Sequence, residues 1–158
     1  MITLILVAIL LAVLYVGIAI WVTKEIPESV SAMVYALPDG GWRWLWTLWM
    51  WAVAFLLAPA MIESIGYDLQ FIAFLTVANL EFCGALPLFM EEHHKAHNIL
   101  GTIAGVMSQI CVCLICPWWL FLWFAFATVR TKAVFFAELI CFVTLTGALL
   151  CHYAWYLF

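Results

Sequence analysis

Residues 2–22 of this chain contain no charged side chain. About 20 such residues in a helix that rises 1.5 Å per residue cross the ~30 Å hydrocarbon core of a bilayer. Over all 158 residues, 70% are hydrophobic and 9% are charged, whereas about 25% are charged in a typical soluble domain. These charged groups are too few to cover the core of a soluble protein of this length. The sequence therefore predicts an integral membrane protein.

The hydrophobic stretches predict an all-α, polytopic bundle of transmembrane helices that forms a single domain over residues 1–158. The fourth stretch, residues 99–129, would be about 46 Å long as one helix, so we expect Pro117 to divide it into two shorter spans. The six expected spans are residues 2–22, 43–62, 69–90, 95–114, 117–130 and 133–157. Five spans are the alternative, in which the segment after Pro117 lies along the membrane interface.

The longest polar stretch, residues 23–43, follows the first span. Pro27 suits the first turn of a short helix, and the Pro-Asp-Gly-Gly sequence at 38–41 would end that helix. We expect this short interfacial helix to lie at the membrane surface. The second span then begins in a cluster of tryptophans, which predicts an aromatic belt at the headgroup level. The cluster comprises Trp42, Trp44, Trp46, Trp49 and Trp51, of which Trp42, Trp44 and Trp46 suit the headgroup level.

Every basic residue falls on one side of the membrane under the six-span count. These residues are Lys24, Arg43, Lys95, Arg130 and Lys132. The positive-inside rule makes that side cytoplasmic and leaves both termini outside. We expect the cytoplasmic (inner) membrane of a bacterium as the location. The five-span alternative moves the last two basic residues to the other side.

Because the net charge is -4 and the chain has no run of basic residues, we expect no nucleic-acid partner. Membrane lipids are the expected partners, together with further copies of this chain or a partner membrane subunit. The six cysteines lie mostly in apolar stretches and are expected to be free thiols. Cys113 and Cys116 form a C-x-x-C pair, for which thiol redox chemistry is a minor alternative.

The most polar cluster of the chain precedes the fourth span. If a helix begins near Glu92, then His93 and His97, or His94 and His97, share one face of it. Two imidazoles and a carboxylate are typical ligands of a divalent metal such as zinc. The candidate ligands are Glu91, Glu92, His93, His94 and His97. The cluster lacks the H-E-x-x-H spacing, and a solvated polar loop is the favoured alternative.

Four polar side chains fall at membrane depth within the expected spans, namely Asn79, Glu81, Gln109 and Glu138. A carboxylate is costly to bury in a bilayer, so Glu81 suggests a functional site by default. We expect these four residues to serve ligand binding or proton relay at a polar pocket between the third, fourth and sixth spans, open to the cytoplasm. The expected lining is Glu81, His94, His97 and Glu138. Hydrogen bonding between helices is the alternative role. Glu138 is also the preferred additional ligand if a metal is bound.

Two short motifs resemble a known group of membrane proteins. Residues 27–31, Pro-Glu-Ser-Val-Ser, follow the first span, and Glu92-x4-His97-Asn98 enters the fourth. Together they resemble small uncharacterised bacterial six-span membrane proteins and, more distantly, the damage-regulated autophagy modulator family. The chain departs from the pattern in the doubled His93-His94 and in the large residues that follow Asn98. The resemblance implies six spans and a membrane or lipid-related role, and it supplies no catalytic residue.

These features lead to one principal prediction and two alternatives. The principal prediction is that the chain binds or transports a small molecule, a proton or a lipid headgroup through the polar pocket. The first alternative is a metal-dependent hydrolase that acts on lipid at the membrane interface. The second is a structural membrane subunit. The sequence leaves open whether the protein is an enzyme.

Overall fold

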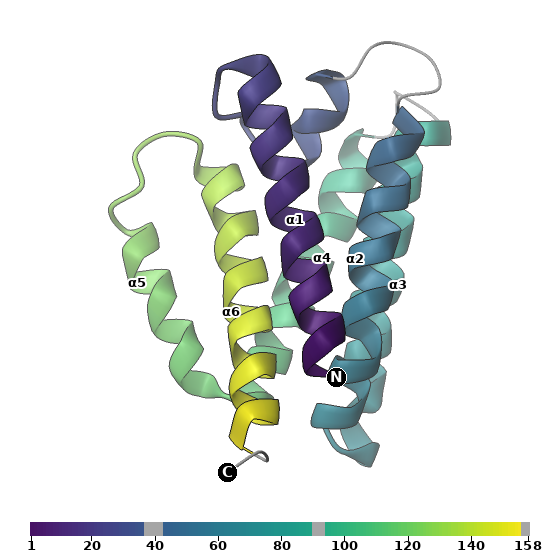
Figure 1. The fold of residues 1–158 in the computed structure, drawn as a ribbon, viewed down its shortest axis with the longest axis vertical. Helices are drawn as coiled ribbons and strands as arrows, with labels where there is room; N and C mark the ends of the chain where they lie inside the picture. The colour runs from purple at the N-terminus through teal and green to yellow at the C-terminus, as the bar shows by residue number, and fades with distance from the viewer. Residues whose placement is uncertain (37–42, 90–93, 156–158) are drawn as a thin grey trace.

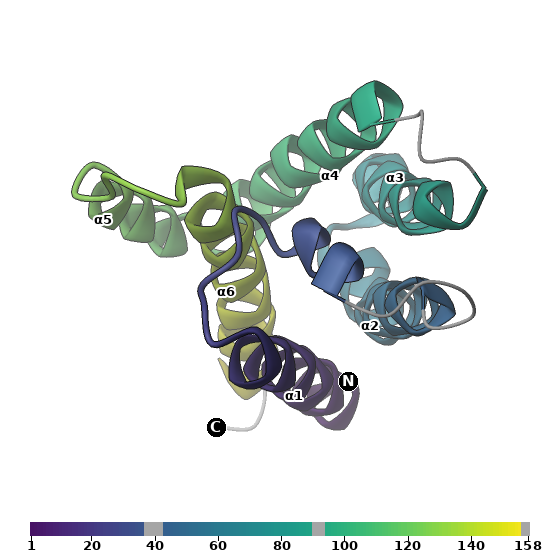
Figure 2. The ribbon, with the colours of Figure 1, turned by 90° about the horizontal axis from the view of Figure 1, so that it is seen from above.

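The structure, a computed structural model, describes residues 1–36, 43–89 and 94–155, which form helices and no strand. Long helices run side by side along the long axis of the molecule (Figure 1). The elements are α1 (Ile2–Thr23), η1 (Ser31–Ala36), α2 (Arg43–Ser64), η2 (Tyr67–Leu69), α3 (Gln70–Phe89), α4 (His94–Ile115), η4 (Pro117–Leu122), α5 (Trp123–Phe126) and α6 (Ala133–Trp155). Seen from above, α2, α3 and α4 lie on one side, and α1 and α6 lie on the other (Figure 2).

Four of the described helices are long and apolar enough to cross a membrane, namely α1, α2, α4 from Lys95 onward, and α6. The expected membrane location is confirmed at this level. Large apolar side chains cover the outside of the helices, such as Leu10, which is 56% exposed, and Phe74, which is 55% exposed. Exposed apolar surface of this extent suits lipid rather than water. α3, of 20 residues, packs between α2 and α4.

The predicted bounds agree with the helices except between α4 and α6. Pro117 does divide the fourth hydrophobic stretch, because α4 ends at Ile115 and Pro117 starts η4. The expected span 117–130 is instead a 3-10 helix, η4, followed by the four-residue α5. A 3-10 helix rises about 2.0 Å per residue, compared with 1.5 Å in an α-helix. The segment is therefore more extended than the regular span that the hydropathy predicts.

α4 and α6 run in the same direction. Gly105 lies beside Cys141, and four residues later the amide of Gln109 accepts a hydrogen bond from the Thr144 hydroxyl at 3.0 Å. The chain between two parallel helices has to return along the bundle. Residues 116–132 make this return, with η4 and α5 rising beside α6 (Figure 1). Both termini therefore lie at the same end of the bundle.

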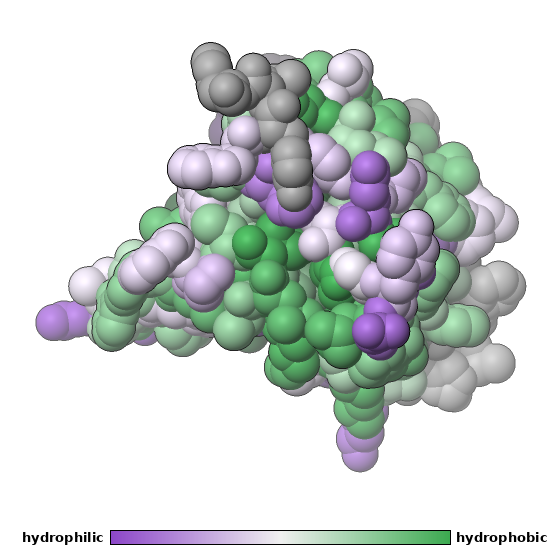
Figure 3. All heavy atoms as spheres, turned by 90° about the horizontal axis from the view of Figure 1, so that it is seen from below, coloured by the Kyte–Doolittle hydropathy of each residue, from purple (hydrophilic) through white to green (hydrophobic). Residues whose placement is uncertain are grey.

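The two ends of the bundle differ in charge. We call one the basic end, because Lys24, Arg43, Lys95, Arg130 and Lys132 all lie where α1 stops and where α2, α4 and α6 start. The other end, which holds both termini, is the terminal end. Viewed from below, most of the terminal end is hydrophobic, with scattered hydrophilic residues (Figure 3). The five basic side chains of the chain thus share one end.

Two tryptophans of α2 connect it to neighbouring helices. Trp49 donates its indole N–H to the Leu11 carbonyl of α1 at 3.1 Å, and Trp51 donates to the Glu81 carbonyl of α3 at 3.0 Å. Trp46 is fully buried. Of the residues expected in the aromatic belt, Trp46 is therefore buried inside the bundle, and Trp42 lies outside the described residues. Trp44 is 50% exposed, as a belt residue would be.

The predicted interfacial helix is a six-residue 3-10 helix, η1, which packs into the basic end of the bundle. It lies between α2 and α6 when seen from above (Figure 2). Met33 and Val34 are 2% and 1% exposed, so η1 is anchored among the helices. The helix begins at Ser31 instead of near Pro27, and its position at the membrane surface stays a prediction. α1 ends at Thr23, and its C-cap residue Lys24 has a left-handed backbone (φ 59°) that turns the chain away.

Candidate functional site

A cavity of about 1290 Å³ lies between the helices, beneath η1. Side chains from α1, α2, α4 and α6 form most of its wall, with shorter contributions from η1, α3, η4 and α5. Most of the lining side chains are apolar, and among the described residues no lysine or arginine lines the cavity. The cavity is therefore suited to an apolar occupant.

The cavity is open on the side of the bundle. Val13 on α1, Val106 on α4 and Val134 on α6 line it, and they are 62%, 55% and 58% exposed. A side chain that both lines a cavity and is more than half exposed marks a place where the cavity reaches the outer surface. In a bilayer this surface faces lipid chains, so an apolar molecule has a route into the cavity that does not pass through water.

Polar lining groups gather near the basic end. Glu138 lies in the second turn of α6, and its carboxylate accepts a hydrogen bond from the Val30 N–H at 2.5 Å. Ser31 of η1 and His97 of α4 also line this part of the cavity. Burial without a partner would be costly for a carboxylate in this position. Here the backbone N–H ahead of η1 supplies the partner.

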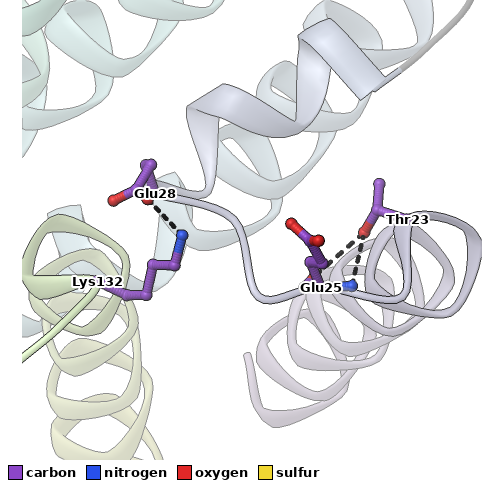
Figure 4. Close-up of polar contacts among 4 residues, drawn as sticks. All are labelled: Thr23, Glu25, Glu28 and Lys132. Atoms are coloured by element: carbon purple, nitrogen blue, oxygen red, sulfur yellow. Dashed lines mark hydrogen bonds and ion pairs between the residues drawn. The ribbon is translucent and has the colours of Figure 1, made fainter.

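Three contacts hold the segment before η1 against the start of α6. Besides the bond to Glu138, the Phe135 N–H donates to the Glu28 carbonyl at 3.1 Å, and Lys132 forms an ion pair with the Glu28 carboxylate. Figure 4 shows the Glu28 and Lys132 side chains pointing toward each other, and Thr23 bonded to the backbone of Glu25 where the chain leaves α1. We call residues 28–34 the strap. It forms the roof of the cavity at the basic end.

His97 pairs with Cys83 across α3 and α4. Its Nδ1 lies 3.0 Å from the Cys83 carbonyl oxygen, and since a carbonyl only accepts, Nδ1 donates this bond. The same nitrogen lies 3.3 Å from the Cys83 Sγ. This geometry fixes the imidazole ring against α3. Cys83 itself is 4% exposed and lines the cavity.

The predicted metal site gains no support from the described residues. Glu91, Glu92 and His93 lie outside them, and only the backbone of His94 is described. Within residues 1–36, 43–89 and 94–155, no three His, Cys, Asp or Glu side chains come together in a way that could hold a metal ion. Glu138, the preferred additional ligand, is bonded to the strap. The metal ligands stay a prediction from sequence.

The membrane-depth polar residues separate into two groups. Gln109 and Glu138 line the cavity, whereas Asn79 and Glu81 do not. Asn79 donates to the Leu75 carbonyl of its own helix at 2.7 Å. On α3 the lining positions are 77, 80 and 83, and each helical residue turns about 100° from the last. Positions 79 and 81 consequently face other directions.

Gln109 connects three elements near the middle of the bundle. Its amide oxygen accepts from the Trp123 indole at 2.8 Å and from the Thr144 hydroxyl at 3.0 Å. Its amide nitrogen donates to the Ser108 hydroxyl at 3.1 Å. Gln109 thus has the interhelical bonding role that was the alternative to ligand binding.

Reasoning from sequence missed Trp46 and Cys83 as lining residues, and also Tyr15, which lies against Trp46. Trp46 and Cys83 line the cavity, and Tyr15 packs against Trp46 with ring centroids 5.8 Å apart. All three occur inside hydrophobic stretches, where nothing in the sequence separates them from ordinary core residues. All six cysteines are free thiols, as expected.

Comparison with protein-family models, curated proteins and solved structures finds no match to this chain.

Proposed function

We propose that this chain is a six-span membrane protein that binds a lipid-like molecule in the cavity between α1, α2, α4 and α6. The observation that carries the proposal is the cavity itself, which is large, apolar and open toward the surrounding lipid. Pockets for small molecules usually measure ~300–1,000 Å³. A volume of about 1290 Å³ suits a longer hydrophobic molecule.

Six spans are supported by the parallel course of α4 and α6. The return of residues 116–132 along the bundle adds one crossing between them, and an even number of crossings agrees with two termini at one end. The gathering of all five basic residues at the other end supports a cytoplasmic basic end and an outer terminal end. The strap would then close the cavity on the cytoplasmic side.

The polar groups of the cavity favour a bound amphipathic molecule over a transported ion or proton. Glu138, Ser31 and His97 cluster near the basic end, while the rest of the lining is predominantly apolar. The described lining residues do not form a chain of titratable groups from one end of the cavity to the other. Glu81 lies outside the cavity. A lipid-related role is also what the resemblance to the autophagy modulators implies.

Replacement of Gly105 by leucine is expected to abolish lipid binding without unfolding the protein. Gly105 lines the cavity, and a Cβ atom built there meets only the Cys141 Sγ, at 3.7 Å. The larger side chain therefore occupies ligand space, while loss of a helical glycine favours the helix by roughly 1 kcal/mol. Native mass spectrometry of detergent-purified protein should show a co-purified lipid adduct on the wild type that is absent from the variant.

Ala125→Leu provides the matched control, because Ala125 is exposed on α5 and does not line the cavity. This variant should retain the adduct. A Gly105→Leu protein that keeps a wild-type lipid adduct would contradict the proposed binding site.

A further inference from the structure

Two cysteines from distant parts of the sequence meet at the terminal end of the bundle. Cys116 lies between the end of α4 and the start of η4, and Cys151 lies near the end of α6. Their thiols are within hydrogen-bonding reach of each other. Cys116 is partly exposed and Cys151 is exposed, so a small reagent has access to the pair.

Trp119 of η4 holds both cysteines in place. Its backbone N–H donates to the Cys116 carbonyl at 3.2 Å, and its indole N–H donates to the Cys151 Sγ at 3.3 Å. The same ring packs on Gly147, one turn before Cys151 on α6. The two sulfurs are therefore kept together by the packing of η4 on α6. A disulfide joins its sulfurs at about 2.0 Å, so thiols already in contact need only a small movement to bond.

The other cysteines have different surroundings. Cys83 lies 3.3 Å from His97 Nδ1, and Cys111 lies 3.9 Å from the Thr76 hydroxyl. Cys113, the other member of the C-x-x-C pair, is part of the cavity wall. The fold thus selects Cys151, and not the neighbour in sequence, as the partner of Cys116.

We propose that Cys116 and Cys151 form a disulfide outside the cytoplasm that ties η4 to the end of α6. The pairing rests on the contact between the two thiols. The compartment rests on the outward-facing terminal end proposed above, because disulfides persist in the periplasm and outside cells and are rare in the cytosol. The bond would join two elements of the cavity wall, since Trp119 on η4 and Leu150 on α6 both line the cavity.

The oxidant is an external disulfide, which reacts by thiol–disulfide exchange. The thiolate of Cys151, the more exposed of the two, attacks one sulfur of that disulfide and releases the other sulfur as a thiolate. The Cys116 thiolate then attacks the Cys151 sulfur of the mixed disulfide and releases the second thiolate. The two cysteines lose two electrons and two protons, and one external disulfide is reduced to two thiols.

The experiment treats reduced, detergent-purified protein with oxidised glutathione, blocks the remaining thiols with N-ethylmaleimide and identifies linked peptides by mass spectrometry. A peptide that joins Cys116 to Cys151 is expected, and dithiothreitol should separate it. Cys151→Ser should lose this link, and Cys113→Ser, the matched control, should keep it. A bond between Cys113 and Cys116, a bond between two copies of the chain, or failure of Cys116 and Cys151 to join overturns the pairing.

The bond should also stabilise the fold, because it restricts the unfolded chain. The thermal unfolding midpoint of the oxidised wild type is expected to exceed that of the reduced protein by at least about 4 °C. Cys151→Ser should show no such difference between oxidising and reducing conditions. Equal midpoints for the oxidised and reduced wild type would overturn the claim that the bond ties η4 to α6.

The thiol state inside cells separates the pairing from the proposed orientation. Bacteria that produce the chain are acidified, and their free thiols are blocked before lysis. The pair is expected to be oxidised already in these cells. A pair that stays reduced in cells but bonds in the purified protein contradicts an outward-facing terminal end, while the pairing itself stands. Binding of lipid in the cavity is tested independently by Gly105→Leu.

Discussion

Replacement of Gly147 by leucine should lower the free energy of unfolding by about 2–3 kcal/mol, even though the change favours a helical backbone. A Cβ atom at position 147 would lie 2.6–2.7 Å from three ring carbons of Trp119. The ring is not free to retreat, because its indole N–H donates to the Cys151 Sγ at 3.3 Å. We expect the clash to separate η4 from α6. Denaturation in mixed detergent micelles, with helicity as the readout, measures the effect.

Gly105→Leu is the natural control for Gly147→Leu, because the substitution and the helical setting are the same but the space at position 105 is open. Delipidated Gly105→Leu protein should be at least as stable as the wild type. The second control removes the ring: in a Trp119→Ala background, Gly147→Leu should cost at least about 1 kcal/mol less. An equal cost in both backgrounds would show that the clash with Trp119 is not the cause.

Replacement of Glu138 by leucine should release the strap and expose the basic end of the cavity. The Val30 N–H would lose its carboxylate acceptor, and a lost bond to a charged group costs about 1.5–3 kcal/mol. Opening of the strap should therefore become about tenfold more frequent, or more. Cys83, which is 4% exposed beneath it, reports on opening. In a variant that retains Cys83 as its single cysteine, a water-soluble maleimide should label this thiol at least about tenfold faster.

Glu138→Gln is the matched control, because the amide keeps an oxygen that accepts the Val30 N–H. Its labelling rate should lie much closer to that of the Glu138 protein. Lys132→Met removes an ion pair in which Glu28 is 77% exposed, and such exposed pairs contribute at most about 1 kcal/mol. A Lys132→Met effect as large as that of Glu138→Leu would show that the strap is held mainly by the outer ion pair.

The long helices were predictable because hydrophobic length alone defines them. The predicted span 2–22 corresponds to Ile2–Thr23, and 95–114 corresponds to His94–Ile115. The strap and the return segment were predicted less well, because tertiary contacts decide their form. η1 depends on Glu138, which lies 108 positions away from Val30 in the sequence. Hydropathy also gives no information on whether an apolar segment adopts the 3-10 geometry of η4.

The candidate site was predicted in part, and the helical phase explains the rest. Glu138 and Gln109 stand out in the sequence as polar residues, and both line the cavity. Glu81 stands out equally, but the rotation of α3 turns it away. Trp46 and Tyr15 are the reverse case, because nothing in the sequence marks them as residues of a site. Their rings look like ordinary membrane residues, and only the packed structure reveals that their donors lack partners within residues 1–36, 43–89 and 94–155.

Three side chains of α2 donate hydrogen bonds to main-chain oxygens of neighbouring helices. Trp49 bonds to the carbonyl of Leu11, Trp51 to that of Glu81 and Thr47 to that of Gly84. A main-chain oxygen is present whatever side chain the position carries. These bonds therefore constrain which side chains can occupy the donor positions on α2. They do not constrain the side chains at the acceptor positions. Relatives of this chain should show little correlated substitution between these pairs, although the helices are in direct contact.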